Sequence, residues 1–308
     1  MGAVFALCLV LSSAPRSVAP LFDDDQALAR AIAARGVPAG EVVVAFAGTT
    51  AIRDFARAAT AGASGPTDAA TRLYDRLLAW KREGRIIGDR EDIPKARSPK
   101  TAADVFRAAL DPKSKDRIAG CYELAVLYVA AARAVGLPAQ GVKRTAETDS
   151  GQIGHVLAGV RAEDGEALTT YDLQKERRGP PLAGDRVLGD LEFAAHHYNH
   201  LAVAAFLAGH LSRARELADW LVLLAPDTPD FLANRATVLI AQGEAALAHA
   251  EAVHAVELAP RVPVYRYVLA KVLIAEGEGA AARAQLVEAL RLFPGYEIAR
   301  RDLAALRD

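Results

Sequence analysis

A long run of apolar positions follows Gly120 in the chain. From Tyr122 to Val135, good helix formers follow one another without Gly or Pro, and Gly136 and Pro138 then end the pattern. Apolar side chains occupy nearly every side of a helix built from these residues. The pattern therefore predicts a helix that is buried inside a domain.

Two later segments alternate between apolar and polar positions in the manner of strands, at residues 155–162 and 167–172. The polar residues between them predict a hairpin turn. A two-residue turn centred on 163–164 would place His155 and Asp172 opposite each other, and a turn centred one residue later would make them diagonal neighbours. In both registers the two side chains share a face of the sheet, so the imidazole and the carboxylate can meet.

The last third of the chain repeats itself with a period of 34 residues, and several columns share that spacing. The columns are Gly209, Gly243 and Gly277; Ala202, Ala236 and Ala270; Ala214, Ala248 and Ala282; and Pro226, Pro260 and Pro294. This period resembles that of tetratricopeptide (TPR) repeats and predicts three two-helix units plus a capping helix over residues 191–308. Stacked units form a concave surface, so we expect a protein or peptide partner there; the alternative is that the array only buttresses the preceding domain.

The chemistry of the chain centres on Cys121, which falls in the first turn of the predicted buried helix. Free N–H groups and the helix dipole favour a thiolate there, lowering the thiol pKa from its ordinary ~8.5. A nucleophilic cysteine needs a base, and the base needs an orienting carboxylate; His155 and Asp172 fit these roles. The plainer alternatives are a packing cysteine, a core histidine and a strand-end carboxylate.

A metal site made of the same three residues is possible by ligand type. However, only one soft ligand is present, and no second Cys–Cys pair exists to complete a tetrahedral cage. The only other cysteine, Cys8, lies in an apolar N-terminal stretch, so a disulfide with Cys121 is not expected. We therefore expect neither a metal nor a cofactor.

The order Cys, His, Asp, together with two longer blocks, resembles the transglutaminase-like core, which is related to papain. The blocks are Gly-Cys-Tyr-Glu-Leu-Ala at 120–125 and Ala-Arg-Ala-Val-Gly-Leu-Pro-Ala at 132–139, followed by Gly154-His155 and Tyr171-Asp172. The resemblance covers about residues 68–190. It implies an α+β fold in which the helix that bears Cys121 packs on an antiparallel sheet, followed by an all-α TPR solenoid.

The resemblance implies acyl transfer at amide bonds through a thioester on Cys121. Water as the second substrate gives a peptidase or amidase, which bacterial relatives of this shape favour, and an amine gives a cross-linking transamidase. The contrasting hypothesis is a non-enzymatic TPR adaptor that keeps the transglutaminase-like fold as an inactive platform. The backbone N–H of Cys121 is the natural first donor to the oxyanion, and no second donor can be assigned.

The N-terminal part of the chain carries weaker patterns. Residues 1–19 contain a short apolar run and a small-x-small ending, as in an export signal of a bacterial protein. We therefore expect a periplasmic or secreted protein, with a cytoplasmic location as the alternative. Residues 20–67 predict a helix-rich region with a strand at 41–46, followed by a flexible connection at 61–67.

Composition narrows the functional classes further. Of the 308 residues, 52% are apolar and 24% charged, which supports two well-built domains. The net charge of −1 provides no basic field, so nucleic-acid binding is not expected. No segment after the leader is long enough to span a bilayer. His196 and His200 lie one helical turn apart and could share a metal, but they are expected in the first helix of the first repeat.

Overall fold

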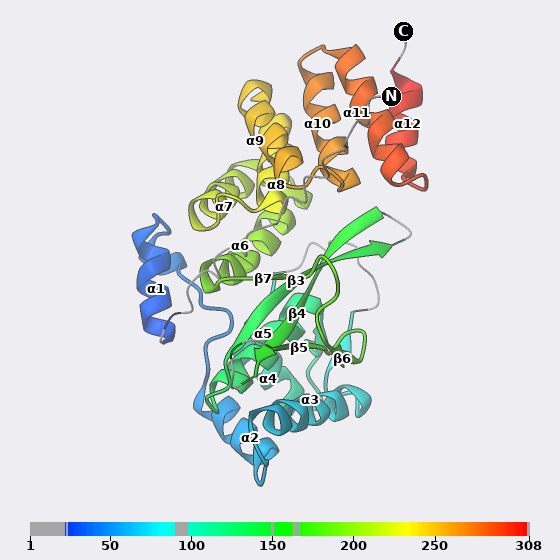
Figure 1. The fold of residues 1–308 in the computed structure, drawn as a ribbon. Coiled ribbons are helices and arrows are strands. Elements are labelled where there is room, and N and C mark those ends of the chain that lie inside the picture. The colour runs from blue at the N-terminus through cyan, green and yellow to red at the C-terminus, as the bar shows by residue number, and fades with distance from the viewer. Residues whose placement is uncertain are drawn as a thin grey trace, which may run out of the picture.

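The computed structural model describes residues 22, 24–89, 98–148, 151–162, 165 and 167–306. The predicted leader lies outside these residues. Three parts follow one another along the described chain: an N-terminal helical region, a sheet with its cysteine-bearing helix, and an array of paired helices (Figure 1). The predicted fold class, an α+β core followed by an all-α solenoid, is confirmed.

The N-terminal helices begin where polar side chains cap them. Asp24, Thr49 and Thr101 each accept a hydrogen bond from a backbone N–H of the first turn that follows. The elements are α1 (Asp25–Ala34), the 3-10 helix η1 (Ala39–Glu41), α2 (Thr50–Thr60), α3 (Pro66–Arg82), β1 (Ile87–Gly88), α4 (Ala102–Leu110) and β2 (Ile118–Ala119). The predicted domain start at residue 68 falls inside α3, and α2 packs against both α3 and the cysteine-bearing helix.

The predicted strand at residues 41–46 is wrong. Instead of pairing with a strand, this segment is bonded to later helices. The Tyr198 hydroxyl accepts from the Val43 N–H at 2.8 Å and donates to the Glu41 carbonyl at 3.0 Å, and the Ala102 N–H donates to the Ala45 carbonyl at 2.7 Å. The β-branched residues gave the segment a strand-like pattern, but a partner 155 residues away satisfies its backbone.

The central sheet packs against helix α5 (Cys121–Arg133), which is the predicted buried helix. The strands are β3 (Ala139–Thr148), β4 (Gly151–Arg161), β5 (Leu168–Asp172), β6 (Arg177–Gly179) and β7 (Arg186–Val187), in the antiparallel order β6-β5-β4-β3-β7. Because β5 pairs with β4 only from Ala158↔Tyr171 onward, β4 and its hairpin partner β3 extend well beyond the end of β5.

The C-terminal part is a repeat array of helices that pack each on the next. The helices are α6 (Asp190–Leu207), α7 (Leu211–Leu224), α8 (Pro229–Ala241), α9 (Ala245–Leu258), α10 (Pro263–Ala275), α11 (Gly279–Leu292) and α12 (Glu297–Ala305). The glycine column has φ of +78° to +82°, as a helix-ending residue in the left-handed region requires. The alanine columns are almost completely buried, as close helix packing requires.

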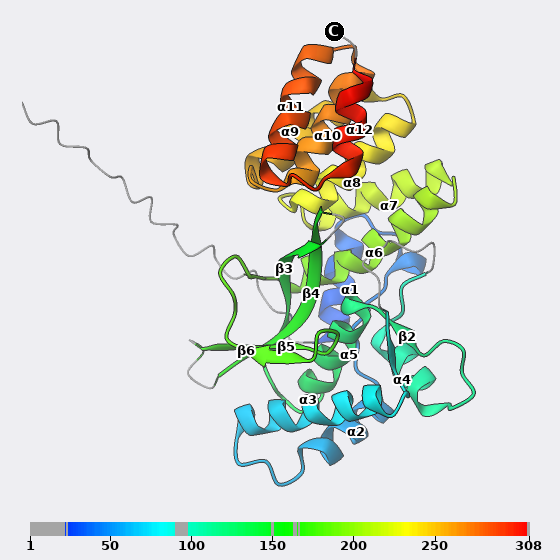
Figure 2. The same cartoon turned by 90° about the vertical axis from the view of Figure 1, so that its right-hand side faces the viewer.

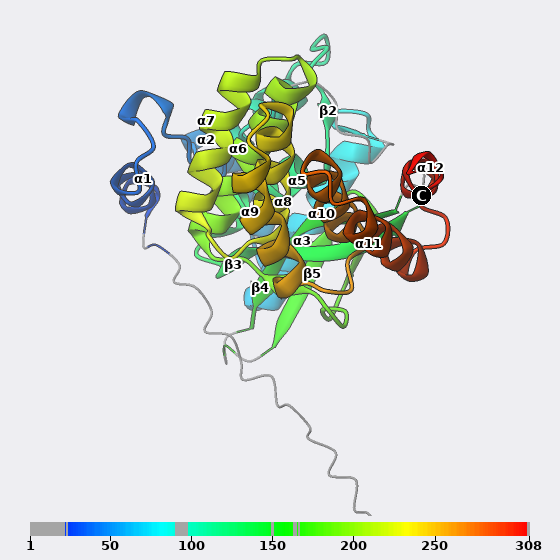
Figure 3. The ribbon, with the colours of Figure 1, turned by 90° about the horizontal axis from the view of Figure 1, so that it is seen from above.

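The hydrophobic core does not follow the division into sheet and repeats. One cluster runs from α1 through α5 and the sheet into α7 and Phe231 of α8, whereas the later repeats have clusters of their own. Figure 2 shows the repeat helices at the opposite end of the molecule from α2 and α3, with the sheet between them. Seen from above in Figure 3, the array lies over the β3–β4 hairpin, and α10 contacts β4. The first repeat is therefore part of the core that carries the sheet.

Candidate active site

Cys121 is the first residue of α5, and a capping interaction from Glu123 fixes the start of this helix. The Glu123 carboxylate accepts from the Gly120 N–H at 2.6 Å and from the Lys100 N–H at 3.0 Å. Gly120 has no side chain, so the cap is supplied by Glu123 from within the first turn. The thiol is free and half-buried. The sulfur is therefore held at the positive end of a rigid helix.

His155 and Asp172 meet across β4 and β5. The register is the one that a turn centred on 164–165 would give, so the two residues are diagonal neighbours. The His155 Nε2 lies 2.7 Å from the Asp172 Oδ2, and each residue is only 4% exposed. A buried contact of this length between an imidazole and a carboxylate orients the ring and favours its charged form.

The other side of the imidazole faces Cys121, with which it forms a hydrogen bond. Because Nε2 is engaged by Asp172, Nδ1 is the ring nitrogen that remains for the sulfur. The Val156 N–H also donates to the sulfur. Cys121 therefore lies beside the part of β4 that extends past the end of β5, and the structure brings all three predicted residues together.

The three groups shift one another's pKa values. Burial alone would raise the pKa of the Cys121 thiol, but the hydrogen bond and positive charge of His155 lower it below its usual value. Burial would likewise lower the pKa of His155, but the bonds to Asp172 and Cys121 raise it to about 9. For Asp172, burial opposes ionisation, and the interaction with His155 prevails and lowers the pKa. The arrangement favours a thiolate–imidazolium pair at neutral pH.

A tight turn after β5 orients the carboxylate of Asp172. Its Oδ1 accepts from the backbone N–H groups of Gln174 at 3.1 Å and Lys175 at 3.0 Å, which leaves Oδ2 for His155. The residues of this turn are also attached to α3, because the Lys81 ammonium donates to the Gln174 carbonyl at 3.0 Å. Sequence reasoning missed these residues, and no motif in the chain marks them.

Stacked aromatic rings set the distance between the helix and the strand that carry the site. Tyr128 of α5 stacks on Tyr171 of β5, with ring centroids 5.0 Å apart, and Tyr171 also contacts Tyr74 of α3. The Tyr128 hydroxyl donates to the Ala70 carbonyl at 2.8 Å. Since Tyr171 precedes Asp172 directly, this packing fixes the carboxylate relative to α5.

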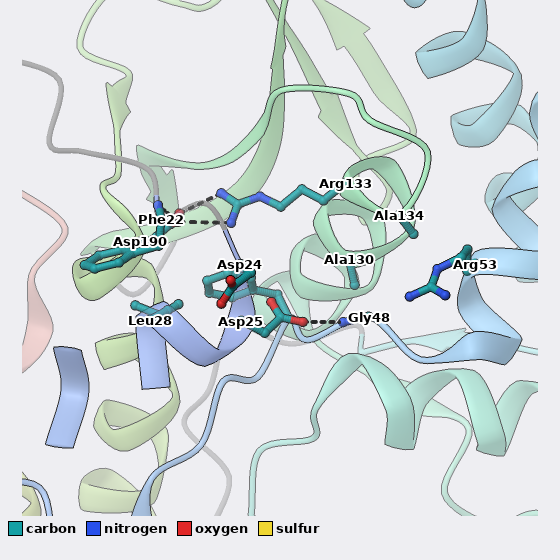
Figure 4. Close-up of a pocket in the computed structure, with 11 residues that line it drawn as sticks. Phe22, Asp24, Asp25, Leu28, Gly48, Arg53, Ala130, Arg133, Ala134 and Asp190 are labelled. Carbon is teal, nitrogen blue, oxygen red and sulfur yellow. Dashed lines mark hydrogen bonds and ion pairs between the residues drawn. The ribbon is translucent and has the colours of Figure 1, made fainter. Parts of the chain in front are cut away.

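Among the cavities lined by described residues, two lie along the core. One, of about 500 Å³, is bounded by Lys81, the β1 backbone and the turn at 174–176, so it adjoins the turn that orients Asp172. The other, of about 290 Å³, lies at the far end of α5, where Arg133 and Asp190 form a paired contact (Figure 4). Arg133 lies twelve positions after Cys121 on the same helix, a distance of ~18 Å, so of these two cavities the first is the nearer to the predicted catalytic residues.

The described residues contain no group of three or more histidine, cysteine or carboxylate side chains placed to hold a metal. His196 and His197 lie buried in α6, and His200 is exposed on the same helix. Over this described part of the chain, no helix has the length and apolar character needed to cross a membrane.

We call α5, the sheet and the helices packed on them the cysteine domain. Residues 53–170 match the family model of the transglutaminase-like superfamily, so this part of the chain is similar to transglutaminase-like domains. The match begins in α2 and ends in β5, two residues before Asp172. A search of curated proteins found no match to the chain.

Several solved structures, TPR domains among them, are similar to the repeat array. The first TPR domain of human RPAP3 is 19% identical, with 36% of this chain and 88% of that chain covered and a TM-score of 0.35. The Arabidopsis OM64 TPR domain is 16% identical, with 37% and 96% covered and a TM-score of 0.34. The Yersinia enterocolitica type III secretion translocator chaperone SycD is 19% identical, with 37% and 83% covered and a TM-score of 0.34. The assignment of the repeats rests instead on the chain's own 34-residue period and helix pairing.

Proposed function

We propose that the chain is a cysteine-dependent enzyme that transfers acyl groups from amide bonds, with water as the usual acceptor. The observation that carries this proposal is the buried 2.7 Å contact between His155 and Asp172, with the same imidazole hydrogen-bonded to the thiol of Cys121. Nucleophile, base and orienting acid are thus joined in one chain of contacts, which is the geometry that covalent catalysis at a carbonyl needs.

The reaction begins when the Cys121 thiolate attacks the amide carbonyl carbon. The carbon–sulfur bond forms as the carbonyl electrons move to oxygen, and the backbone N–H of Cys121 is the first donor to that oxyanion. The His155 imidazolium then gives its proton to the leaving amine as the carbon–nitrogen bond breaks, leaving a thioester. Neutral His155 next takes a proton from water, whose oxygen attacks the thioester carbon. The carbon–sulfur bond then breaks with its electrons moving to sulfur, which releases a carboxylic acid and restores the thiolate–imidazolium pair.

The repeat array supports a protein or peptide as the substrate or partner. Stacked two-helix units present a continuous concave surface, and an extended segment fits such a surface. The array here lies over the β3–β4 hairpin of the sheet that carries His155 (Figure 3). A chain bound along the array is therefore placed close to the cysteine domain.

Mass spectrometry of a peptide pool can test the reaction and its acceptor together. Peptides rich in glutamine and containing internal amides are incubated with the protein, with and without a primary amine. Backbone cleavage or a gain of one mass unit at glutamine indicates hydrolysis, and an amine adduct indicates transamidation. A Cys121→Ala variant is the control, because it removes the nucleophile and alanine, a strong helix former, keeps the start of α5 intact.

Alkylation with iodoacetamide across a pH range tests the site without knowledge of the substrate. The thiolate alone reacts, so a lowered pKa predicts rapid alkylation of Cys121 well below pH ~8.5. A rate that follows an ordinary thiol titration, with no product in the peptide assay, would instead support the non-enzymatic adaptor.

A further inference from the structure

A buried ion pair connects the sheet of the cysteine domain to the repeat array. The ammonium of Lys143, on β3, contacts the carboxylate of Asp230, on α8. The two side chains are only 14% and 24% exposed. The other carboxylate oxygen of Asp230 accepts from the Tyr265 hydroxyl of α10 at 2.7 Å. Residues from two successive repeats therefore hold the carboxylate that pairs with this lysine of the sheet.

The same lysine lies next to the candidate active site. In the β3–β4 register Lys143 is directly opposite Val156, the residue whose N–H donates to the Cys121 sulfur. The Lys143 side chain passes over Gly154, where an added Cβ would come within 1.9 Å of the Lys143 Nζ. Glycine at this position thus leaves room for an ammonium one residue before His155.

Several elements contribute titratable groups near Lys143. Cys121 on α5, His196 on α6 and Asp230 on α8 interact with it directly. Beside these groups lie His155 on β4, His200 on α6, Arg186 on β7 and Tyr265 on α10. Burial lowers the pKa of His196 far below its usual value, so that ring stays neutral near pH 7. Arg186 is paired with Glu192. Besides His155, the Lys143 ammonium also lowers the pKa of the Cys121 thiol.

We infer that Lys143 is a positioning residue of the active site and that the repeat array completes this site, because Asp230 holds the Lys143 ammonium near the Cys121 sulfur. This inference rests on the proposed function of Cys121 as the nucleophile. A nearby ammonium stabilises the thiolate over the thiol, and an acidic partner keeps that ammonium charged and in place. The repeats then serve catalysis as well as binding.

The first test measures iodoacetamide alkylation of Cys121 against pH in a Cys8→Ser background, so that one thiol is followed. Lys143→Met is expected to raise the midpoint of the rate profile by about one pH unit. Lys143→Arg keeps the charge and is expected to restore most of the shift. Lys271→Met is the matched control, because Lys271 pairs with Asp302 inside the array at 3.1 Å, away from the thiol.

The second test concerns Asp230. In Asp230→Asn the Lys143 ammonium would be left largely buried without a counter-charge, so it would move toward water. This movement takes the positive charge away from the thiol, and the midpoint is expected to rise as in Lys143→Met. A midpoint unchanged in both variants, with circular dichroism showing a folded chain, would overturn the inference.

The two proposals fail in distinguishable ways. If the parent protein already shows an ordinary thiol titration, the proposed function fails first. If the parent thiol has a low pKa and the Lys143 and Asp230 variants keep it, the nucleophile stands and only the role of the array is rejected. A shift in Lys271→Met equal to that in Lys143→Met would also count against the inference, because it would show a general effect of losing a lysine.

Discussion

The cysteine domain and the repeat array are built from contacts of different range. In the cysteine domain, Tyr74 reaches the Asp172 carbonyl across 98 residues, and the site joins three distant segments. In the array, three cross-repeat hydrogen bonds each span 35 residues, one more than the repeat period: Asn199–Asn234, Asp230–Tyr265 and Tyr267–Asp302. A repeat array loses stability in local steps, whereas a site made by distant segments is lost as a unit.

The first repeat makes long-range contacts with the cysteine domain although it belongs to the array. Its second helix belongs to the hydrophobic cluster of the sheet, and Asp190 at the start of α6 pairs with Arg133 at the end of α5. The sequence period therefore marks where repeats begin but not where the cysteine domain ends. Variants on each side of this junction can show which contacts act as a unit.

The largest effect is expected from Asp172→Asn. Loss of the charge that orients His155 should lower kcat/KM on the order of 10³- to 10⁴-fold. The pKa of His155, raised to about 9, should also fall, since Asp172 is a main cause of its elevation. Activity that depends on the imidazolium is retained below the folded pKa and lost as pH rises through it, so the alkaline limb should move to lower pH. Rate measurements against pH on a peptide amide can check both effects.

The matched control for this prediction is Asp302→Asn. Asp302 accepts from the Tyr267 hydroxyl at 3.0 Å and from Lys271, but it does so inside the array. Its substitution should leave the position of the alkaline limb unchanged. Equal losses of activity in the two variants would argue that Asp172 acts only through stability.

The second largest effect is expected at the junction, from Asp190→Ala. The Asp190 carboxylate is 1% exposed and accepts from Arg133 at 3.0 and 2.6 Å and from the Phe22 N–H at 2.9 Å (Figure 4). Its removal leaves a largely buried guanidinium unpaired, at a cost of about 3 kcal/mol. Urea denaturation should show a lower midpoint for the transition that includes α5.

An exposed pair provides the control for the junction. Glu288 and Arg291 form an ion pair on the surface of α11 at 2.7 Å, and Glu288→Ala should leave the stability almost unchanged because solvent screens the pair. If Asp190→Ala costs no more than this control, the junction does not couple the two regions, and the cysteine domain and the array unfold independently.

Much of this architecture could be predicted from the sequence, because it is encoded locally. The apolar run after Cys121 predicted the buried helix. The alternation of apolar and polar residues predicted β4 and β5, and the 34-residue period predicted the repeat array. The parity of the hairpin placed His155 and Asp172 on one face before the register was known. Each of these predictions uses neighbouring residues, or residues one repeat apart, whose spacing follows directly from helix and strand geometry.

The rest could not be predicted, because it depends on side chains that meet only after folding. No pattern relates Lys143 to Asp230, which are 87 residues apart, or marks Val156 as a donor to the sulfur. The segment at 41–46 resembles a strand until Tyr198 binds its backbone. The contacts of Lys143 and Tyr198 lie where other parts of the chain meet the array. Sequence patterns over neighbouring residues cannot predict such contacts, because the partners are far apart in the chain.

A moderate effect confined to the array is expected from Ala282→Leu. Ala282 is fully buried on α11, and larger side chains in a packed interior typically cost about 1–3 kcal/mol. The loss should appear in the denaturation of the array, while the alkylation profile of Cys121 stays unchanged. The control is Ala284→Leu, an exposed position two residues further along the same helix. A shifted alkylation profile in Ala282→Leu would show that packing in the last repeat reaches the site.

The smallest effect is expected from Gly277→Ala, which separates backbone geometry from packing. Gly277 has φ of +82°, and an added Cβ would meet no atom within 4 Å, so the only cost is backbone strain of about 1 kcal/mol. Gly279 begins α11 and has equally open surroundings without a positive φ. Gly279→Ala should therefore be neutral or stabilising, and chemical denaturation should show shifts of different sign. Equal destabilisation by both would contradict the role of backbone geometry. In the cysteine domain, by contrast, Gly154 is required for space, because a Cβ there would meet Lys143.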